Sequence, residues 1–216
     1  MPTTIVLADD HKLILESVAA LLTGVPDFKV VAKCLNGREL VHCVQLLHPR
    51  VAVVDICMPG LNGIDAVTRI RKISPSTRTI ALSLFSDNEH VCEMLDAGVV
   101  GFVVKSDAPT ELIRAIRYGS RGKIYLSQDC PHDAVIKERS PAPRTNRVLE
   151  VSQLTRRERE ILQLISEGHS SPEIAELLNV NKSTIKSHRK NLMEKLDLHD
   201  VASLTREAIR LKLIHL

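Results

Sequence analysis

No stretch of the 216-residue chain approaches the roughly 18 to 20 consecutive apolar residues that a membrane span requires. The first residues, MPTTIVLADDHK, contain no basic leader followed by a cleavable apolar segment, so we do not expect secretion. The chain also lacks a CxxC pair, and its odd number of scattered cysteines argues against a disulfide framework or a zinc site. These absences favour a cytoplasmic protein with reduced thiols and no membrane partner. The five cysteines are Cys34, Cys43, Cys57, Cys92 and Cys130.

The composition that remains is that of an ordinary globular protein. Hydrophobic residues make up 44% of the chain and charged residues 25%, and the length suffices for one large or two small domains. The formal net charge is only +3, but it is unevenly distributed. Residues 1–121 carry 13 basic and 13 acidic side chains, whereas residues 182–195 carry five basic and one acidic. A basic stripe indicates a polyanionic partner, although a solvated helix face is the commoner meaning of a charge run.

Short apolar runs alternate with amphipathic helical patterns through the first 120 residues. Repeated βα units predict a five-stranded parallel sheet with helices on both faces, a doubly wound α/β fold of the flavodoxin-like type. In such sheets the working site lies beyond the carboxyl ends of the strands. The predicted strands are 4–8, 28–33, 51–55, 79–83 and 101–105, and the predicted helices are 13–22, 38–47, 64–73, 89–97 and 110–118.

The pattern changes twice in the remaining chain. Periodicity is lost after residue 120, and KERSPAPRTNR at 137–147 is polar with two prolines, which predicts a linker. From residue 154 the pattern is helical to the end, which predicts a small all-α domain of four helices. We therefore predict a first domain over 1–121, a linker over 122–151 and a second domain over 152–216.

Polar side chains follow the predicted strands of the first domain. Asp9 and Asp10 follow the first strand, Asp55 ends the third, Ser83 the fourth and Lys105 the fifth. Burying a charge at the end of an apolar strand is costly, so such a carboxylate is normally held by a cation or used in chemistry. Carboxylates at one edge favour Mg²⁺, with Asp55 as an in-line nucleophile towards a phosphoryl group. Each residue alone is more often a strand cap or a surface charge.

Together these motifs resemble the receiver domain of two-component response regulators, over about residues 3–120. The resemblance rests on the DD pair, on DxxMPGxxG at 55–63, on Ser83 and on Lys105 with Phe102 before it. It implies a phospho-acceptor regulator that is not an enzyme and that catalyses only its own phosphorylation and dephosphorylation. The roles it implies are Asp55 as phospho-acceptor, Asp10, Asp55 and the backbone carbonyl of Cys57 as Mg²⁺ ligands, Asp9 as a ligand through water, Ser83 as switch hydroxyl, Phe102 as aromatic switch and Lys105 as phosphate clamp.

The second domain contains the signals of a helix-turn-helix. Thr155 with Glu158 forms a capping box, and Pro172 lies in the first turn of the next helix. A tight turn at 179–181 leads into the basic helix over 182–196. Ile185, Leu192, Met193 and Leu196 form its predicted buried side, which leaves Lys182, Lys186, Arg189 and Lys190 free to meet a major groove and its phosphates.

The segment from LTRRE through EIAELL to STIKSHRKNLMEKL is similar to the LuxR-type DNA-binding domain. With the receiver, it identifies the chain as a member of the NarL/FixJ family of response regulators. The resemblance implies a sensor histidine kinase or a small acyl phosphate as phosphoryl donor, double-stranded promoter DNA as partner, and a homodimer when phosphorylated or DNA-bound. It also implies that Lys186, Ser187 and Lys190 face bases, while Ser183, Thr184 and Arg189 contact the DNA backbone.

Two other functions are open on the residues alone. A phosphatase also uses a strand-end aspartate with Mg²⁺, but haloacid-dehalogenase phosphatases need a second aspartate at the position that Cys57 occupies. Alternatively, the receiver acts only as a protein-binding module and is never phosphorylated. A phosphatase would also leave the helix-turn-helix unexplained, and the complete set of strand-end residues favours the phosphorylation switch over the unphosphorylated module.

Overall fold

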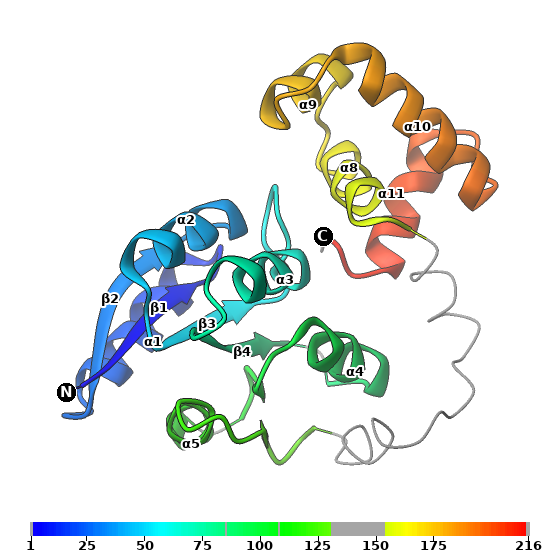
Figure 1. The fold of residues 1–216 in the computed structure, drawn as a ribbon. Helices are drawn as coiled ribbons and strands as arrows, with labels where there is room; N and C mark the ends of the chain where they lie inside the picture. The colour runs from blue at the N-terminus through cyan, green and yellow to red at the C-terminus, as the bar shows by residue number, and fades with distance from the viewer. Residues whose placement is uncertain (1, 85, 108, 131–153, 215–216) are drawn as a thin grey trace. The chain divides into compact units, whose positions relative to one another are not determined.

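The computed structural model describes residues 2–84, 86–107, 109–130 and 154–214. These residues form two compact units, one before and one after the undescribed segment 131–153 (Figure 1). The predicted domain boundaries remain predictions, and residues 131–151 of the predicted linker lie outside the described residues. Among the described residues, no helix is both long and apolar enough to cross a membrane.

The first unit is built on a parallel sheet with strand order β2-β1-β3-β4-β5-β6. The prediction of five strands is wrong by one, because Tyr125 and Leu126 pair with β5 as a sixth strand within the range predicted as linker. Two residues are too few to produce a recognisable alternating pattern. The strands are β1 (Thr3–Ala8), β2 (Phe28–Cys34), β3 (Val51–Asp55), β4 (Arg78–Ser83), β5 (Gly101–Val104) and β6 (Tyr125–Leu126).

Helices cover both faces of this sheet, as the βα alternation predicts (Figure 1). Side chains of α1 and α5 share one apolar cluster with β1, β3 and β4, including Leu15, Leu22, Leu112 and Ile116. β3 is buried along its whole length, which explains why it is continuously apolar up to Asp55. The helices are α1 (Lys12–Thr23), α2 (Gly37–Leu47), α3 (Gly63–Ile73), α4 (Asn88–Ala97) and α5 (Pro109–Gly119).

The second unit is all-helical, as predicted. Its core joins residues of all four helices, among them Ile161, Ile174, Ile185 and Leu204. The capping box is confirmed, because the Thr155 side chain accepts from the Glu158 backbone N–H while the Glu158 carboxylate accepts from that of Thr155. Pro172 lies in the first turn of the second helix, again as predicted. The helices are α8 (Arg156–Ser166), α9 (Ser171–Leu177), α10 (Lys182–Leu196) and α11 (Val201–Arg210).

Candidate functional site

An acidic site forms at the carboxyl edge of the sheet. β1 and β3 are neighbours, so Asp9 and Asp10, which follow β1, lie beside Asp55, which ends β3. β4 and β5 are the next strands in the sheet, and they bring Ser83 and Lys105 to the same edge. The sheet order therefore gathers at one edge five residues that are up to 96 positions apart (105 − 9) in the sequence.

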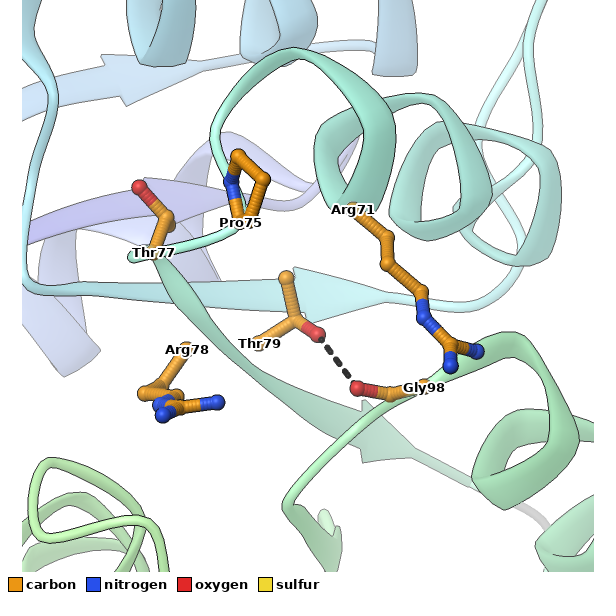
Figure 2. Close-up of a pocket in the computed structure, with 6 residues that line it drawn as sticks. All are labelled: Arg71, Pro75, Thr77, Arg78, Thr79 and Gly98. Atoms are coloured by element: carbon orange, nitrogen blue, oxygen red, sulfur yellow. Dashed lines mark hydrogen bonds between the residues drawn. The ribbon is translucent and has the colours of Figure 1, made fainter.

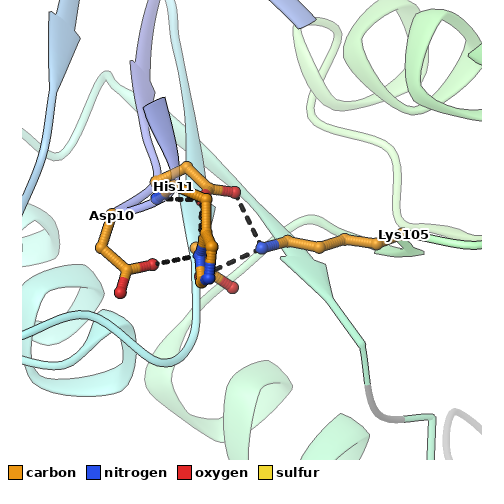
Figure 3. A network of polar contacts seen from close by, with 5 residues as sticks. Asp10, His11 and Lys105 are labelled. Atoms are coloured by element: carbon orange, nitrogen blue, oxygen red, sulfur yellow. Dashed lines mark hydrogen bonds and ion pairs between the residues drawn. The ribbon is translucent and has the colours of Figure 1, made fainter. Parts of the chain in front are cut away.

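Lys105 joins the carboxylates of this site. Its Nζ lies 2.8 Å from Asp9 Oδ2 and 3.1 Å from Asp55 Oδ2 (Figure 3). Asp9 is 3% exposed and Asp55 4% exposed, so both ion pairs are shielded from solvent. A buried carboxylate pair that shares one ammonium group carries net negative charge, and this charge favours an additional cation.

His11 also belongs to this site, although the sequence reasoning assigned it no role. Its ring Nδ1 lies 2.8 Å from Asp10 Oδ1, and its backbone N–H donates to Asp9 Oδ1 at 2.9 Å (Figure 3). Ligand atoms of Asp9, Asp10, His11 and Asp55 all lie within 4.8 Å of one another. The only sequence signal for His11 was its position directly after the DD pair.

The surroundings of the acidic site shift the pKa values of Asp55 and Lys105. Burial raises the pKa of the Asp55 carboxyl from 3.8 to about 6; Asp9 acts in the same direction, and Lys105 opposes it. For Lys105, burial acts to lower the pKa of the ammonium, but the carboxylates of Asp55 and Asp9 more than offset this and raise it. At neutral pH Asp55 is therefore mostly ionised, and Lys105 is charged.

The loop after β3 packs tightly against Asp55. A side chain at Gly63 would place its Cβ 2.2 Å from the Asp55 carbonyl oxygen, so only glycine fits at the start of α3. The preceding Asn62 caps α3 by accepting the Asp65 N–H at 2.9 Å. Cys57 is buried in this loop. The predicted role of its carbonyl as a metal ligand stays a prediction.

Ser83 and Phe102 occupy the positions that the sequence predicts, and their switch roles stay predictions. Ser83 is 1% exposed, and its carbonyl accepts the Lys105 backbone N–H at 2.7 Å. This bond ties the end of β4 to the residue that contacts Asp9 and Asp55. The Phe102 side chain is fully buried, which equally suits an ordinary core residue.

The second unit contains the predicted helix-turn-helix, formed by α9 and α10. Asn179, between the two helices, has a left-handed backbone with φ of 49°, which makes the tight turn. Ile185 and Leu192 of α10 are buried, and Met193 and Leu196 pack against the same core, as predicted. Lys182, Ser183, Thr184, Lys186, Ser187 and Lys190 are exposed, and Arg189 is half-buried.

Lys190 and Lys195 of α10 differ in how accessible their ammonium groups are to a polyanion such as DNA. Lys190 makes an exposed pair with Glu194 at 3.6 Å, which contributes little and leaves the ammonium accessible. Lys195 instead contacts Glu158, the capping residue of α8, at 2.9 Å. The basic charge of α10 that remains accessible therefore lies towards its first three turns.

Comparison with known families gives two matches, one in each of the two units. Residues 5–117 match the family described as response regulator receiver domain. Residues 152–208 match the bacterial regulatory proteins of the luxR family.

Relatives and solved structures cover almost the whole chain. The nitrate/nitrite response regulator protein NarL of Escherichia coli K12 is 33% identical over 91% of this chain and 90% of its own length. The oxygen regulatory protein NreC of Staphylococcus epidermidis is 32% identical over 97% of this chain and 98% of its own. A structure of the response regulator RcsB of Salmonella typhimurium matches with a TM-score of 0.65 and 26% identity, covering 99% of each chain. An RcsB–DNA complex matches with a TM-score of 0.56 and 26% identity over the full length of both chains. The chain therefore belongs to the NarL/FixJ family of two-component response regulators, which are transcriptional regulators that combine a receiver domain with a LuxR-type DNA-binding domain.

Proposed function

We propose that Asp55 accepts a phosphoryl group and that this modification controls dimerisation and promoter binding. The observation that carries the proposal is the ion-pair arrangement of Lys105, whose single ammonium contacts both Asp9 and Asp55. An ammonium placed between a nucleophile and a second carboxylate is positioned to contact an incoming phosphoryl oxygen. The raised but still sub-neutral pKa of Asp55 keeps this carboxylate ionised for attack at pH 7.

The transfer follows from these positions. An oxygen of Asp55 attacks phosphorus in line, the new O–P bond forms, and the donor's P–N or P–O bond breaks as its imidazole or carboxylate leaves. Lys105 moves its pairing from the Asp55 oxygen to a phosphoryl oxygen, and the Ser83 hydroxyl donates to another. Phe102 follows Ser83 and thereby changes the face used for docking or dimerisation.

The carboxylates suit Mg²⁺, since a hard cation of this kind prefers oxygen ligands and retains several waters. Asp10, Asp55 and the Cys57 carbonyl would hold it, with Asp9 acting through water. Mg²⁺ supplies charge neutralisation at the transferring phosphoryl group. The approach of His11 to Asp10 orients that carboxylate at the rim of the site.

The second unit binds double-stranded promoter DNA in this proposal. Lys186, Ser187 and Lys190 face bases, while Ser183, Thr184 and Arg189 contact the backbone. Lys182 is free to meet the major groove and its phosphates. The support is that six of these side chains are exposed and Arg189 is half-buried on the second helix of a helix-turn-helix, while the apolar side of that helix packs against the core.

The remaining expectations follow from this function. The phosphoryl donor is a sensor histidine kinase or a small acyl phosphate, the active form is a homodimer, and the protein acts in the bacterial cytoplasm, where promoter DNA lies. It is a phospho-acceptor regulator and not an enzyme that converts a separate substrate. We retain the domain assignment of 1–121, 122–151 and 152–216, although β6, which lies in the range 122–151, pairs with β5 of the first unit.

Incubation with acetyl phosphate and Mg²⁺, followed by intact-mass measurement, tests the proposal. The protein should gain one phosphoryl group. Asp55→Asn should gain none, whereas Asp27→Asn, which removes an exposed carboxylate before β2, should behave like the unmodified sequence. No gain by the unmodified protein, or an equal gain by Asp55→Asn, would contradict the assignment.

A further inference from the structure

Residues 125–130, which we call the strap, run along the edge of β5 that faces away from β4. Their first two residues form β6, and the sheet order places β5 between β4 and β6. The Tyr125 N–H donates to the Val100 carbonyl at 3.0 Å, and the Ser127 N–H donates to the Phe102 carbonyl at 3.0 Å. The strap lies outside the first domain predicted over 1–121. Part of the predicted linker therefore contacts the strand that leads to the acidic site.

The Ser127 side chain completes the hydrogen bonding at the end of β5. Its Oγ accepts the Val104 backbone N–H at 3.1 Å, beyond the last residue of β6. Ser127 is fully buried and Val104 is 5% exposed, so this bond is shielded from solvent. A buried backbone N–H that lacks an acceptor is costly. The Ser127 hydroxyl therefore supplies an acceptor at a position that the β5–β6 pairing no longer reaches.

β4 holds the opposite side of β5 at both ends. At the amino end, the Val100 N–H donates to the Thr79 carbonyl at 2.8 Å, and the Thr79 hydroxyl lies 3.5 Å from the Gly98 carbonyl (Figure 2). At the carboxyl end, the Lys105 N–H donates to the Ser83 carbonyl at 2.7 Å. This side of β5 is thus fixed by contacts that do not involve the strap.

The backbone of Lys105 is held from both sides of β5 as a result. Its own N–H bonds to β4, and the N–H of the preceding Val104 bonds to Ser127. The side chain that extends from this backbone places its Nζ 2.8 Å from Asp9 and 3.1 Å from Asp55. Both contacts depend on where the end of β5 lies, because the side chain starts there.

Cys130 orients the Ser127 hydroxyl. Its Sγ lies 3.4 Å from Ser127 Oγ and donates to the Phe102 carbonyl at 3.8 Å. Because the thiol hydrogen is used on Phe102, the hydrogen between sulfur and oxygen comes from Ser127, which leaves a lone pair of that oxygen for the Val104 N–H. Burial raises the pKa of the Cys130 thiol, so the thiol stays protonated at neutral pH.

We propose that Ser127 is a positioning residue for phosphoryl transfer, which holds the end of β5 so that Lys105 reaches the phosphoryl group on Asp55. This role rests on the proposed function of Asp55 and adds to it a residue from outside the predicted receiver domain. Ser127 acts through the backbone, since its hydroxyl contacts the Val104 N–H and not the reacting atoms. A misplacement of about 1 Å in a catalytic arrangement can cost on the order of a hundredfold in rate.

The test measures how fast acetyl phosphate with Mg²⁺ phosphorylates the full chain, by intact mass and per folded molecule, with the folded fraction taken from circular dichroism. Ser127→Ala should react about tenfold more slowly or worse. Ser127→Cys keeps the volume but offers sulfur, a weak acceptor, so it should also react slowly and replaces the alanine variant if that one does not fold. Ser120→Ala removes a hydroxyl that donates to the Arg117 carbonyl at 3.0 Å, and it should react like the unmodified sequence.

A second background separates positioning from a general loss of structure. In Lys105→Ala, the further substitution Ser127→Ala should change the rate by less than about twofold, because the side chain that Ser127 positions is absent. Equal slowing in both backgrounds would overturn the proposal. An unchanged rate of the Ser127 variants in the presence of Lys105 would overturn it too. If the unmodified protein gains no phosphoryl group, the proposed function of Asp55 fails instead.

Amide hydrogen exchange in metal-free buffer tests the contact without any phosphoryl donor. In Ser127→Ala the Val104 amide should exchange about tenfold faster, the size expected for one lost hydrogen bond, whereas the amides of β1 should change much less. Equal exchange of the Val104 amide in the variant and the unmodified protein would show that Ser127 does not hold the end of β5, and the proposal would be wrong.

Discussion

Replacing Asp55 with asparagine should stabilise the receiver unit at neutral pH in metal-free buffer. Asp55 is 4% exposed, and its pKa rises from 3.8 to about 6 through burial. The folded receiver therefore binds this proton more tightly than the unfolded chain does, and stability falls as pH rises from about 4 to about 6. A pKa increase from 3.8 to about 6 corresponds to about 3 kcal/mol, at about 1.4 kcal/mol per pKa unit.

The chain contains a convenient probe for this measurement. It has no tryptophan, and its two tyrosines, Tyr118 and Tyr125, both lie in the first unit. Tyrosine fluorescence during urea unfolding therefore reports the receiver unit alone, which avoids treating two units as one transition. The free energy of unfolding of Asp55→Asn should exceed that of the unmodified protein by about 3 kcal/mol at pH 7. Near pH 3.5 the two free energies should be almost equal. Leu13→Ala, an exposed position on α1, serves as a control without a pH-dependent effect.

Magnesium should reverse part of this difference. Binding to the folded state stabilises by about 2.7 kcal/mol when the ligand is present at 100 times its dissociation constant. Asparagine is a weaker ligand for Mg²⁺ than a carboxylate, so Mg²⁺ should stabilise the unmodified protein more than it stabilises Asp55→Asn. If Asp55→Asn is no more stable than the unmodified protein at pH 7, or if the difference is the same at pH 3.5, the burial argument for Asp55 is wrong.

Three further results are expected. Lys186→Ala or Lys190→Ala should cost about 1–3 kcal/mol of specific DNA affinity if the lysine contacts a base. If the lysine contacts only a phosphate, binding to all duplexes should weaken, and the slope of log affinity against log salt concentration should fall by about one. Unchanged anisotropy titrations on target and unrelated duplexes would remove α10 from the interface. Acetyl phosphate should raise the DNA affinity of the full chain by roughly 5- to 150-fold, the range that about 1–3 kcal/mol of coupling gives, but leave a fragment from residue 152 unchanged. Equal affinity of the full chain with and without donor, matching that of the fragment, would show that the receiver does not gate binding. Thr155→Ala should destabilise the second unit by about 1 kcal/mol in thermal unfolding because the cap of α8 is lost, and Thr155→Ser should retain it.

The sequence by itself determined what depends on near neighbours in the chain. Continuous apolar runs predict β3 and its partners, the three-residue spacing of Thr155 and Glu158 predicts the cap of α8, and the Asn-Val-Asn sequence at 179–181 predicts the turn into α10. The acidic site was also predictable, because all parallel strands of one sheet end at the same edge. Knowing which strands end in Asp9, Asp55 and Lys105 is enough to place those side chains together.

Tertiary structure decided what depends on distance and burial. Only the strand order brings Arg71, Arg78 and Gly98 to one end of the sheet, since no local pattern links a helix end, a strand start and a later turn. The contact of the His11 ring with Asp10 depends on the conformations that the two side chains adopt after β1, and the two residues of β6 are too few for a pattern. The pKa of Asp55 likewise follows from desolvation, a property of the folded surroundings that residue identity does not encode.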